Sequence, residues 1–289
     1  MIRDYVVIIG SMKSGSTTLF AQLDAHAHVV GARPKEPGFF AFEEVHAMGW
    51  DWYEGLFAWQ EGTSRYALDG STDYTKAPFT CGVIDRFKAA EAEGRRFKFL
   101  YIMRHPVERL VSHARHVALK QKEVGQFISP RKDHGLDAGL SPVNLACSDY
   151  AGQLEHYRPW FERGDLHLLT LEQLVADGSG TMRQIGAFLG LDDLNFTAER
   201  ERENAMNART RANPLWEQMS QVGGLKKVAT TIVPAGAREK LKQSMRKPVE
   251  IPGRFELHES ERGELNARFS EQAQLLQDNF GFDPKWDFS

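Results

Sequence analysis

The stretch of sequence that decides the fold is Tyr5-Val6-Val7-Ile8-Ile9-Gly10-Ser11-Met12-Lys13-Ser14-Gly15-Ser16-Thr17-Thr18. Its first five residues form a continuous apolar run, which predicts a strand buried on both faces of a parallel sheet. Gly10 and Gly15 frame a loop, and the spacing of Leu19, Phe20 and Leu23 predicts an amphipathic helix over 17–27. A loop between a strand and a helix N-terminus can bind an anion, because backbone N–H groups and the helix dipole point at it.

The glycine spacing of this loop resembles a P-loop, but Ser16 and Thr17 stand where a Walker A motif requires Lys followed by Ser or Thr. The lysine lies inside the loop instead, at Lys13, where it can neutralise charge on a transferring group or a leaving oxygen. The alternative is an ordinary glycine turn with a solvated lysine, and the strand–loop–helix context favours the anion site. The residues predicted to form that site are Lys13, Ser14, Gly15, Ser16, Thr17 and Thr18.

The rest of the chain alternates strand and helix patterns, which predicts a three-layer α/β fold with a central, mainly parallel sheet. Because no linker interrupts the pattern, we expect residues 1–289 to form a single domain. We expect 125–142 to be a loop. The predicted elements are helices over 84–93, 106–122, 150–162, 182–189 and 260–279, and strands over 97–103 and 166–170.

Composition narrows the class of protein. The net charge of −3 argues against a surface built to bind nucleic acid, so any anion site must be local. Cys81 and Cys147 lie far apart, without the spacing of a disulfide framework or a zinc site, and the acidic pairs lack partners for any other metal. No apolar run has the length of a signal-peptide core or a membrane span. We therefore expect a cytoplasmic protein without a membrane anchor or a bound metal; the oligomeric state is not predicted.

A second chemical motif follows the predicted strand over 97–103. Arg104 leaves the end of this strand, and Ser112, eight residues later, lies two turns along the next helix. Ligands of parallel sheets bind at the carboxyl ends of the strands, so Arg104 and the Lys13 loop are expected to meet there. Arg104 alone could be an ordinary salt-bridging arginine, and Ser112 alone could be an ordinary helix serine. Together with the loop they indicate two anion sites, which suit a bis-phosphorylated nucleotide.

These motifs resemble those of the sulfotransferases that use PAPS (3′-phosphoadenosine 5′-phosphosulfate), in particular the heparan-sulfate and bacterial branches. The loop from Lys13 to Thr18 matches the family's 5′-phosphosulfate loop, and Arg104 through Ser112 matches its 3′-phosphate motif. Lys35-Glu36-Pro37-Gly38-Phe39-Phe40 is similar to the family's Lys-Glu-x-x-Phe-Phe segment, so the resemblance implies that Glu36 is the general base. It also implies sulfuryl transfer from PAPS to a hydroxyl or amine of a glycan, lipid or small metabolite, with release of PAP.

The chain departs from the family pattern at two places. Gly70 stands where the heparan-sulfate branch has a lysine, for which Lys76 is a candidate substitute. The late Lys-Gly-Arg nucleotide loop is also missing, and Arg209 and Arg211 are candidates for its role.

Four questions stay open at the level of sequence. A P-loop nucleotide or small-molecule kinase would need the absent Walker lysine and a magnesium-binding carboxylate. A non-catalytic nucleotide-binding protein would keep the loop without the chemistry. Glu36 itself could be a surface carboxylate paired with Lys35 or Arg33. The aromatic residues between 39 and 59 could either pack the core or line an acceptor pocket.

Overall fold

The computed structural model describes residues 1–123, 141–194, 196, 210–211, 247–248 and 257–289. The chain forms two compact units, one of Met1–Thr197 with Arg254–Ser289 and one of Ala198–Gly253. In the second unit, β6 (Thr210–Arg211) pairs antiparallel with β7 (Lys247–Pro248). The motifs up to Ser112 all lie in the first unit.

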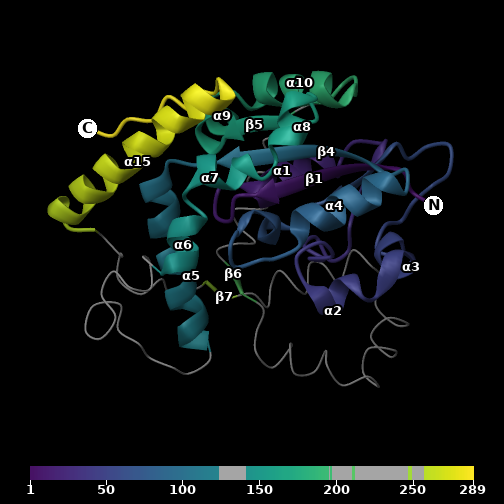
Figure 1. Cartoon of the computed structure of the whole chain (residues 1–289), viewed down its shortest axis with the longest axis horizontal. Coiled ribbons are helices and arrows are strands. Elements are labelled where there is room, and N and C mark those ends of the chain that lie inside the picture. Colours follow the sequence, from purple (N-terminus) through teal and green to yellow (C-terminus); the bar gives the residue numbers. More distant parts are fainter. Residues whose placement is uncertain (124–140, 195, 197–209, 212–246, 249–256) are drawn as a thin grey trace. The chain divides into compact units, whose positions relative to one another are not determined.

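The first unit is built on a parallel sheet of strand order β2-β3-β1-β4-β5 (Figure 1). The register aligns Val7 of β1 with Asp69 of β3 on one side and with Phe99 of β4 on the other. The strands are β1 (Asp4–Gly10), β2 (Val29–Gly31), β3 (Tyr66–Asp69), β4 (Arg96–Met103) and β5 (Leu166–Thr170). The predicted parallel α/β fold and the three predicted strands are confirmed.

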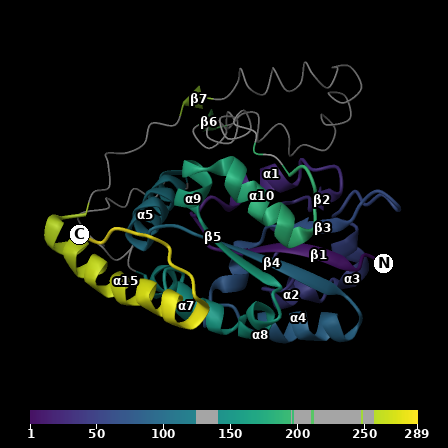
Figure 2. The ribbon, with the colours of Figure 1, turned by 90° about the horizontal axis from the view of Figure 1, so that it is seen from above.

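Helices cover both faces of this sheet, which explains why β1 is apolar without alternation (Figure 2). Val6 and Ile8 pack with α1 (Ser16–Leu23), α9 (Leu171–Ala176) and α10 (Gly178–Leu189). Tyr5, Val7 and Ile9 pack with the opposite layer. That layer contains α3 (Gly49–Glu54), α4 (Val83–Ala92), α7 (Tyr150–Glu155), α8 (Arg158–Glu162) and part of α15 (Glu259–Phe280).

The connections change faces next to β1. The helix that follows β1, α1, packs on one face, whereas α4, which joins β3 to β4, packs on the other. In open parallel sheets a crevice forms at the carboxyl ends of the strands where the chain changes direction in this way. The remaining helices are α2 (Glu43–His46), the 3₁₀ helix η1 (Thr72–Thr75), α5 (Pro106–Glu123) and α6 (Pro142–Ala146).

The helix predicted over 17–27 is shorter in the structure, where α1 ends at Leu23, and two other predicted helices differ from the observed ones for local reasons. The helix predicted over 150–162 is divided into α7 and α8, because Pro159 has no N–H and its ring would clash with the preceding turn. Proline is tolerated in the first turn of a helix, so α8 begins at Arg158. α10 begins four residues earlier than its predicted start at 182, because the Asp177 side chain accepts a hydrogen bond from Gly180 N at 2.8 Å.

The aromatic residues between 39 and 59 pack mainly in the core. Phe39 and Phe40 are fully buried, and the ring of Phe40 stacks on Phe87 of α4 with 4.0 Å between centroids. Phe57 is also buried, and Trp50 packs at the edge of the same cluster. The structure therefore favours the core interpretation over an acceptor pocket.

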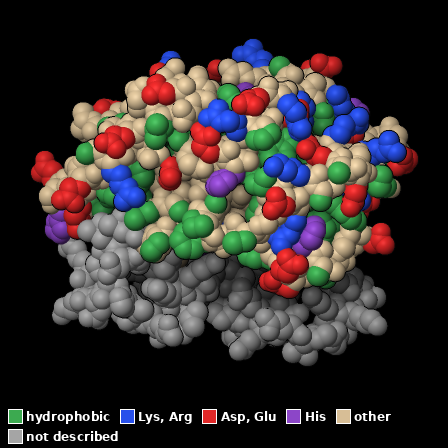
Figure 3. All heavy atoms as spheres, viewed as in Figure 1, with side chains coloured by type: hydrophobic (Ala, Val, Ile, Leu, Met, Phe, Trp, Pro, Cys, Tyr) green, Lys and Arg blue, Asp and Glu red, His purple; other side chains and the backbone are tan. Residues whose placement is uncertain are grey.

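Acidic and basic side chains alternate on the face of the molecule shown in Figure 3. No broad basic surface is visible on this face. None of the helices in the described part of the chain combines the length and hydrophobicity that crossing a bilayer requires.

Candidate functional site

The loop between β1 and α1, residues 11–15, has a backbone suited to an anion and is called the phosphate loop below. Lys13 and Gly15 adopt positive φ values of 72° and 92°, and such left-handed residues are typical of loops whose successive N–H groups form an anion-binding concavity. A side chain at position 15 would also place Cβ 2.7 Å from Leu171 Cδ1, which explains the glycine. Ser11 Oγ and Ser14 Oγ lie 2.6 Å apart and fix the interior of the loop. α1 then begins at Ser16, with its N-terminus at this loop.

The segment that follows β2 brings Glu36 to the same place. Lys35 Nζ lies 2.6 Å from Glu36 Oε1, 3.4 Å from Ser16 Oγ and 3.2 Å from the carbonyl oxygen of Gly70. The pairing of Glu36 with Lys35 is thus observed, but Lys35 also contacts the first residue of α1. Glu36 therefore lies beside the phosphate loop, with 42% of its side chain exposed.

The side chain of Lys35 packs against Gly70, the position at which the heparan-sulfate branch has a lysine. A Cβ at position 70 would lie 3.0 Å from Lys35 Cε and 2.8 Å from Phe20 Cδ2. Lys35 therefore supplies a cation at this point. The other candidate, Lys76, forms an ion pair with Asp73.

Buried Asp69 anchors the segment that carries Glu36. Its carboxylate accepts hydrogen bonds from Tyr53 Oη at 2.8 Å, Tyr74 Oη at 2.7 Å and Ser71 Oγ at 2.6 Å. Ser71 Oγ in turn accepts from Gly38 N at 3.0 Å. Burial raises the pKa of Asp69, and the hydrogen bonds oppose this rise. A polar network inside the core thus holds residues 36–38 at the carboxyl edge of the sheet.

We expect Tyr74→Phe to lower the free energy of unfolding by about 1.5–3 kcal/mol, because it removes a buried hydrogen bond to a carboxylate. Tyr66→Phe is the matched control: it removes an equally buried bond to the carbonyl oxygen of Leu189 and should cost about 0.5–1.5 kcal/mol. Urea denaturation of both variants measures the difference. Equal losses of unfolding free energy in the two variants would show that the Asp69 side chain, which accepts the hydrogen bond of Tyr74, is not charged.

Arg104 lies where β4 ends and α5 begins, close to the phosphate loop. The hydroxyl of Tyr150 donates to the carbonyl oxygen of Arg104 at 2.7 Å and also lies beside Ser11 and Ser14 of the loop. The Arg104 guanidinium is 27% exposed and contacts Glu108 only at 3.9 Å. Ser112 follows two turns along α5, partly buried. The structure thus brings the two predicted anion motifs to one edge of the sheet.

Positive charge gathers around His113 of α5. Burial, the largest cause, lowers the pKa of His113 to about 4, and the charges of Arg109, His116, Lys13 and Lys76 lower it further. His113 Nδ1 is buried without a hydrogen-bond partner among the described residues. The loop, the end of η1 and α5 thus place several cationic side chains near His113.

His113 makes the stability of the protein sensitive to acid. Because its pKa falls from 6.5 in the unfolded chain to about 4 in the folded protein, the unfolded chain binds more protons between these values. The free energy of unfolding should therefore decrease as the pH falls from about 6.5 towards 4, and His113→Gln should reduce this decrease. Urea titrations at several pH values test this expectation. An unchanged pH slope in the variant would contradict it.

Two residues of the site were not predicted from the sequence, and two predicted residues are not placed at the site. The contacts of Lys35 with Ser16 and of Arg109 with the carbonyl oxygen of Met12 were missed, although Arg109 lies within the segment from Arg104 to Ser112 that the sequence singled out. Arg209 lies outside the described residues. Arg211 is described only as part of strand β6 in the second unit, so its relation to the site stays a prediction. The described residues contain no group of three or more His, Cys, Asp or Glu side chains that could hold a metal ion.

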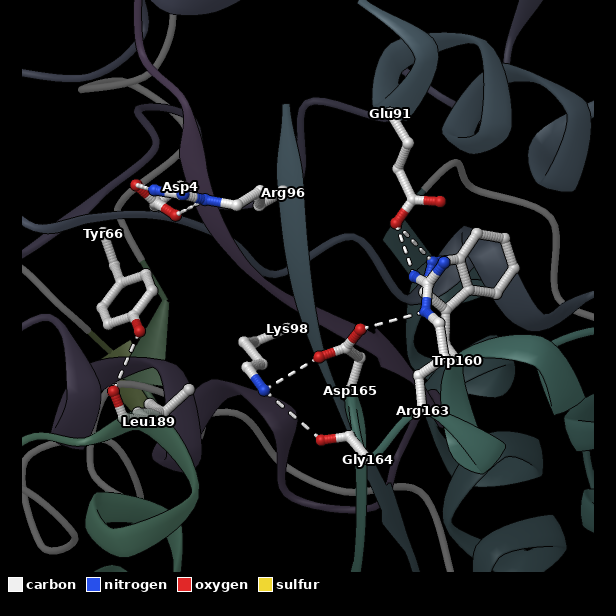
Figure 4. Close-up of polar contacts among 10 residues, drawn as sticks. All are labelled: Asp4, Tyr66, Glu91, Arg96, Lys98, Trp160, Arg163, Gly164, Asp165 and Leu189. Atoms are coloured by element: carbon white, nitrogen blue, oxygen red, sulfur yellow. Dashed lines mark hydrogen bonds and ion pairs between the residues drawn. The ribbon is translucent and has the colours of Figure 1, made fainter. Parts of the chain in front are cut away.

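A cavity at the opposite edge of the sheet is separate from this site. It has a volume of about 410 Å³ and lies beside Asp4 and Arg96, the first residues of β1 and β4, at the amino ends of the strands. Each cation that lines it is paired with a carboxylate: three pairs form among the lining residues, and Arg95 pairs with Glu93 at 2.6 Å. The pairs are Arg96–Asp4 at 2.6 Å, Lys98–Asp165 at 2.8 Å and Arg163–Glu91 at 2.7 Å (Figure 4).

A parallel sheet that presents a glycine-framed loop, a helix N-terminus and an arginine at its carboxyl edge is typical of α/β proteins that bind phosphate-like anions. Comparison with known proteins narrows this class. The profile of the sulfotransferase domain family matches residues 3–245, and the chain belongs to this family. The resemblance inferred from the motifs is therefore confirmed at the level of the family.

Individual relatives agree with this assignment. Heparan sulfate glucosamine 3-O-sulfotransferase 3A1 of Mus musculus is 27% identical over 190 residues, which cover 64% of this chain and 45% of the relative. Heparan sulfate glucosamine 3-O-sulfotransferase 6 of Homo sapiens is 27% identical over 188 residues, which cover 64% and 52%. The match spans about half the length of these relatives.

A solved structure supports the fold. The crystal structure of a sulfotransferase from Alicyclobacillus acidocaldarius superposes with a TM-score of 0.59 and covers 98% of both chains at 20% sequence identity. At this sequence identity the likeness concerns the fold.

Proposed function

We propose that this protein transfers a sulfuryl group from PAPS to an acceptor hydroxyl or amine and releases PAP. The observation that carries the proposal is the meeting of three groups at one edge of the sheet: the Lys13 loop, Arg104 and Glu36. Tyr150 links Arg104 to the loop, and Lys35 links Glu36 to Ser16. The family assignment supports the same chemistry.

In the proposed reaction Glu36 takes the proton of the acceptor, whose oxygen or nitrogen attacks the sulfur of the donor. The bond between this sulfur and the bridging oxygen of the 5′-phosphate breaks, and PAP leaves with the electron pair on that oxygen. Lys13 offsets the charge that develops there, and the loop N–H groups with Thr17 and Thr18 hold the 5′-phosphate. Arg104 and Ser112 bind the 3′-phosphate, with Arg209 and Arg211 as candidates for further contacts.

Several wider features belong to the same proposal. We propose that residues 1–289 act as one sulfotransferase domain, and that the protein is cytoplasmic, in agreement with the two free cysteines, Cys81 and Cys147. The acceptor class stays open among glycans, lipids and small metabolites. The names of the two mammalian relatives make glycan hydroxyls the first acceptors to assay.

Nucleotide selectivity tests the proposed function. We expect PAP to bind more tightly than AMP, because Arg104 and Ser112 lose their partner when the 3′-phosphate is absent. A hydrogen bond to a charged group contributes about 1.5–3 kcal/mol, so Arg104→Ala should remove most of the preference, on the order of 10–100-fold in affinity. Calorimetry with both nucleotides measures it.

The two alternatives give different results in these assays. Equal affinity of the wild type for PAP and AMP would overturn the assignment and favour a kinase that recognises the 5′-phosphates alone. Tight PAP binding without any sulfuryl transfer across a panel of glycan, lipid and small-molecule acceptors would instead favour a non-catalytic nucleotide-binding protein.

A further inference from the structure

Arg109 is a buried charge whose contacts are all neutral. Its side chain is fully buried on α5, between Arg104 and Ser112. Nε donates to Ser148 Oγ at 2.7 Å, and Nη2 donates to Asn144 Oδ1 at 2.6 Å and to the carbonyl oxygen of Asn144. Nη1 lies 3.5 Å from the carbonyl oxygen of Met12. No carboxylate among the described residues forms an ion pair with this guanidinium.

Such an arrangement is costly in a protein interior. A charge taken out of water needs hydrogen bonds and an opposite charge nearby, and Arg109 has only the hydrogen bonds. Its field reaches the neighbouring groups: it lowers the pKa of His113 and opposes the burial-driven rise in the pKa of Tyr150 and Cys147. The folded protein therefore keeps an unbalanced positive charge directly behind the phosphate loop.

The contacts of Arg109 also join three segments of the site. Met12 precedes Lys13, whose positive φ shapes the loop. Asn144 lies in α6, and Ser148 precedes α7, which carries Tyr150. Arg109 itself stands on the helix that carries Ser112. One side chain thus connects the loop for the 5′-phosphate with the helix for the 3′-phosphate.

We propose that Arg109 is a positioning residue for the donor: it holds the Met12–Lys13 segment against α5, and the bound 5′-phosphosulfate supplies the negative charge that balances it. This inference rests on the proposed function. Arg109 does not itself touch the acceptor in this proposal. Its replacement should therefore weaken the binding of the donor and leave the binding of the acceptor unchanged.

Three variants test this role. Arg109→Met removes the charge and the hydrogen bonds, and we expect it to weaken PAP binding by roughly 30–100-fold, because a hydrogen-bonded charge is lost. Arg109→Lys keeps the charge but not the fork of donors, and should recover about half of that loss on a logarithmic scale. Ser148→Ala, the matched control, removes one neutral hydrogen bond from Arg109 and should change PAP affinity by only about 3-fold.

The measurements are calorimetry with PAP and steady-state kinetics with PAPS and an acceptor, on variants whose folding is checked by circular dichroism. A positioning role raises the KM for PAPS and leaves the KM for the acceptor within about 2-fold. A purely structural role lowers thermal stability while the folded fraction binds PAP normally, and this result in Arg109→Lys would overturn the inference even if Arg109→Met does not fold. If the wild type itself fails to prefer PAP over AMP, the proposed function fails and not this inference alone.

Discussion

Replacing Glu36 by Gln should lower turnover by on the order of 10²–10⁴, the range that general acid–base catalysis contributes. Gln keeps the size of the side chain and can still hydrogen-bond to Lys35, but it cannot accept a proton. Because Glu36 meets the loop only through Lys35, the affinity for PAP should barely change. Turnover with saturating PAPS and calorimetry with PAP measure the two quantities separately.

Glu44→Gln is the control for this substitution, since Glu44 is an exposed carboxylate on α2. It should leave turnover unchanged. A Glu36→Gln enzyme within a few-fold of the wild type would remove Glu36 from the mechanism. Asp73, which is paired with Lys76 and lies in the same basic region, would then be the next base to test.

Replacing Lys13 by Ala should lower turnover by about 10²–10³, because a group that stabilises developing charge in the transition state is lost. Unlike Glu36, Lys13 belongs to the phosphate loop, so we also expect the affinity for PAP to fall. The combination of a lower kcat and weaker nucleotide binding would distinguish Lys13 from the base. Single-turnover kinetics with PAPS separates binding from the transfer step.

Lys88→Ala provides the control for Lys13, since it removes an exposed lysine from α4 without touching the loop. Normal turnover of Lys13→Ala with weaker PAP binding alone would restrict Lys13 to binding the donor. Arg104→Ala should show that second pattern, which makes it a useful reference for the comparison.

The long buried elements of the fold could be predicted because their signals are local. β1 and β4 are continuous apolar runs, and the proline at the start of α5 marks its beginning. The strands β2 and β3 were missed, because three or four residues are too few to show a periodic pattern. Pro159 explains the one helix that was predicted as continuous and is divided.

The site could be predicted as far as its motifs are contiguous in sequence. The loop around Lys13, the Arg104 motif and the Glu36 segment are local patterns, and the parallel sheet brings them together. The roles of Lys35, Asp69 and Arg109 depend on contacts between residues far apart in the chain, such as Lys35 with Gly70 and Arg109 with Asn144. No local pattern reports those contacts, so they became visible only in the folded structure.

The Asp69 network has a consequence for how this protein can be altered. Through Ser71 it attaches the backbone of Gly38, and with it the segment that carries Glu36, to the same buried tyrosines that hold α3 and η1 in place. We therefore expect this part of the candidate site to unfold together with the core and not to open as an independent loop. Substitutions at 36–38 that aim to broaden the range of acceptors should therefore also lower the stability of the fold. Substitutions at exposed neighbours of this segment should leave the hydrogen bonds of the Asp69 network intact.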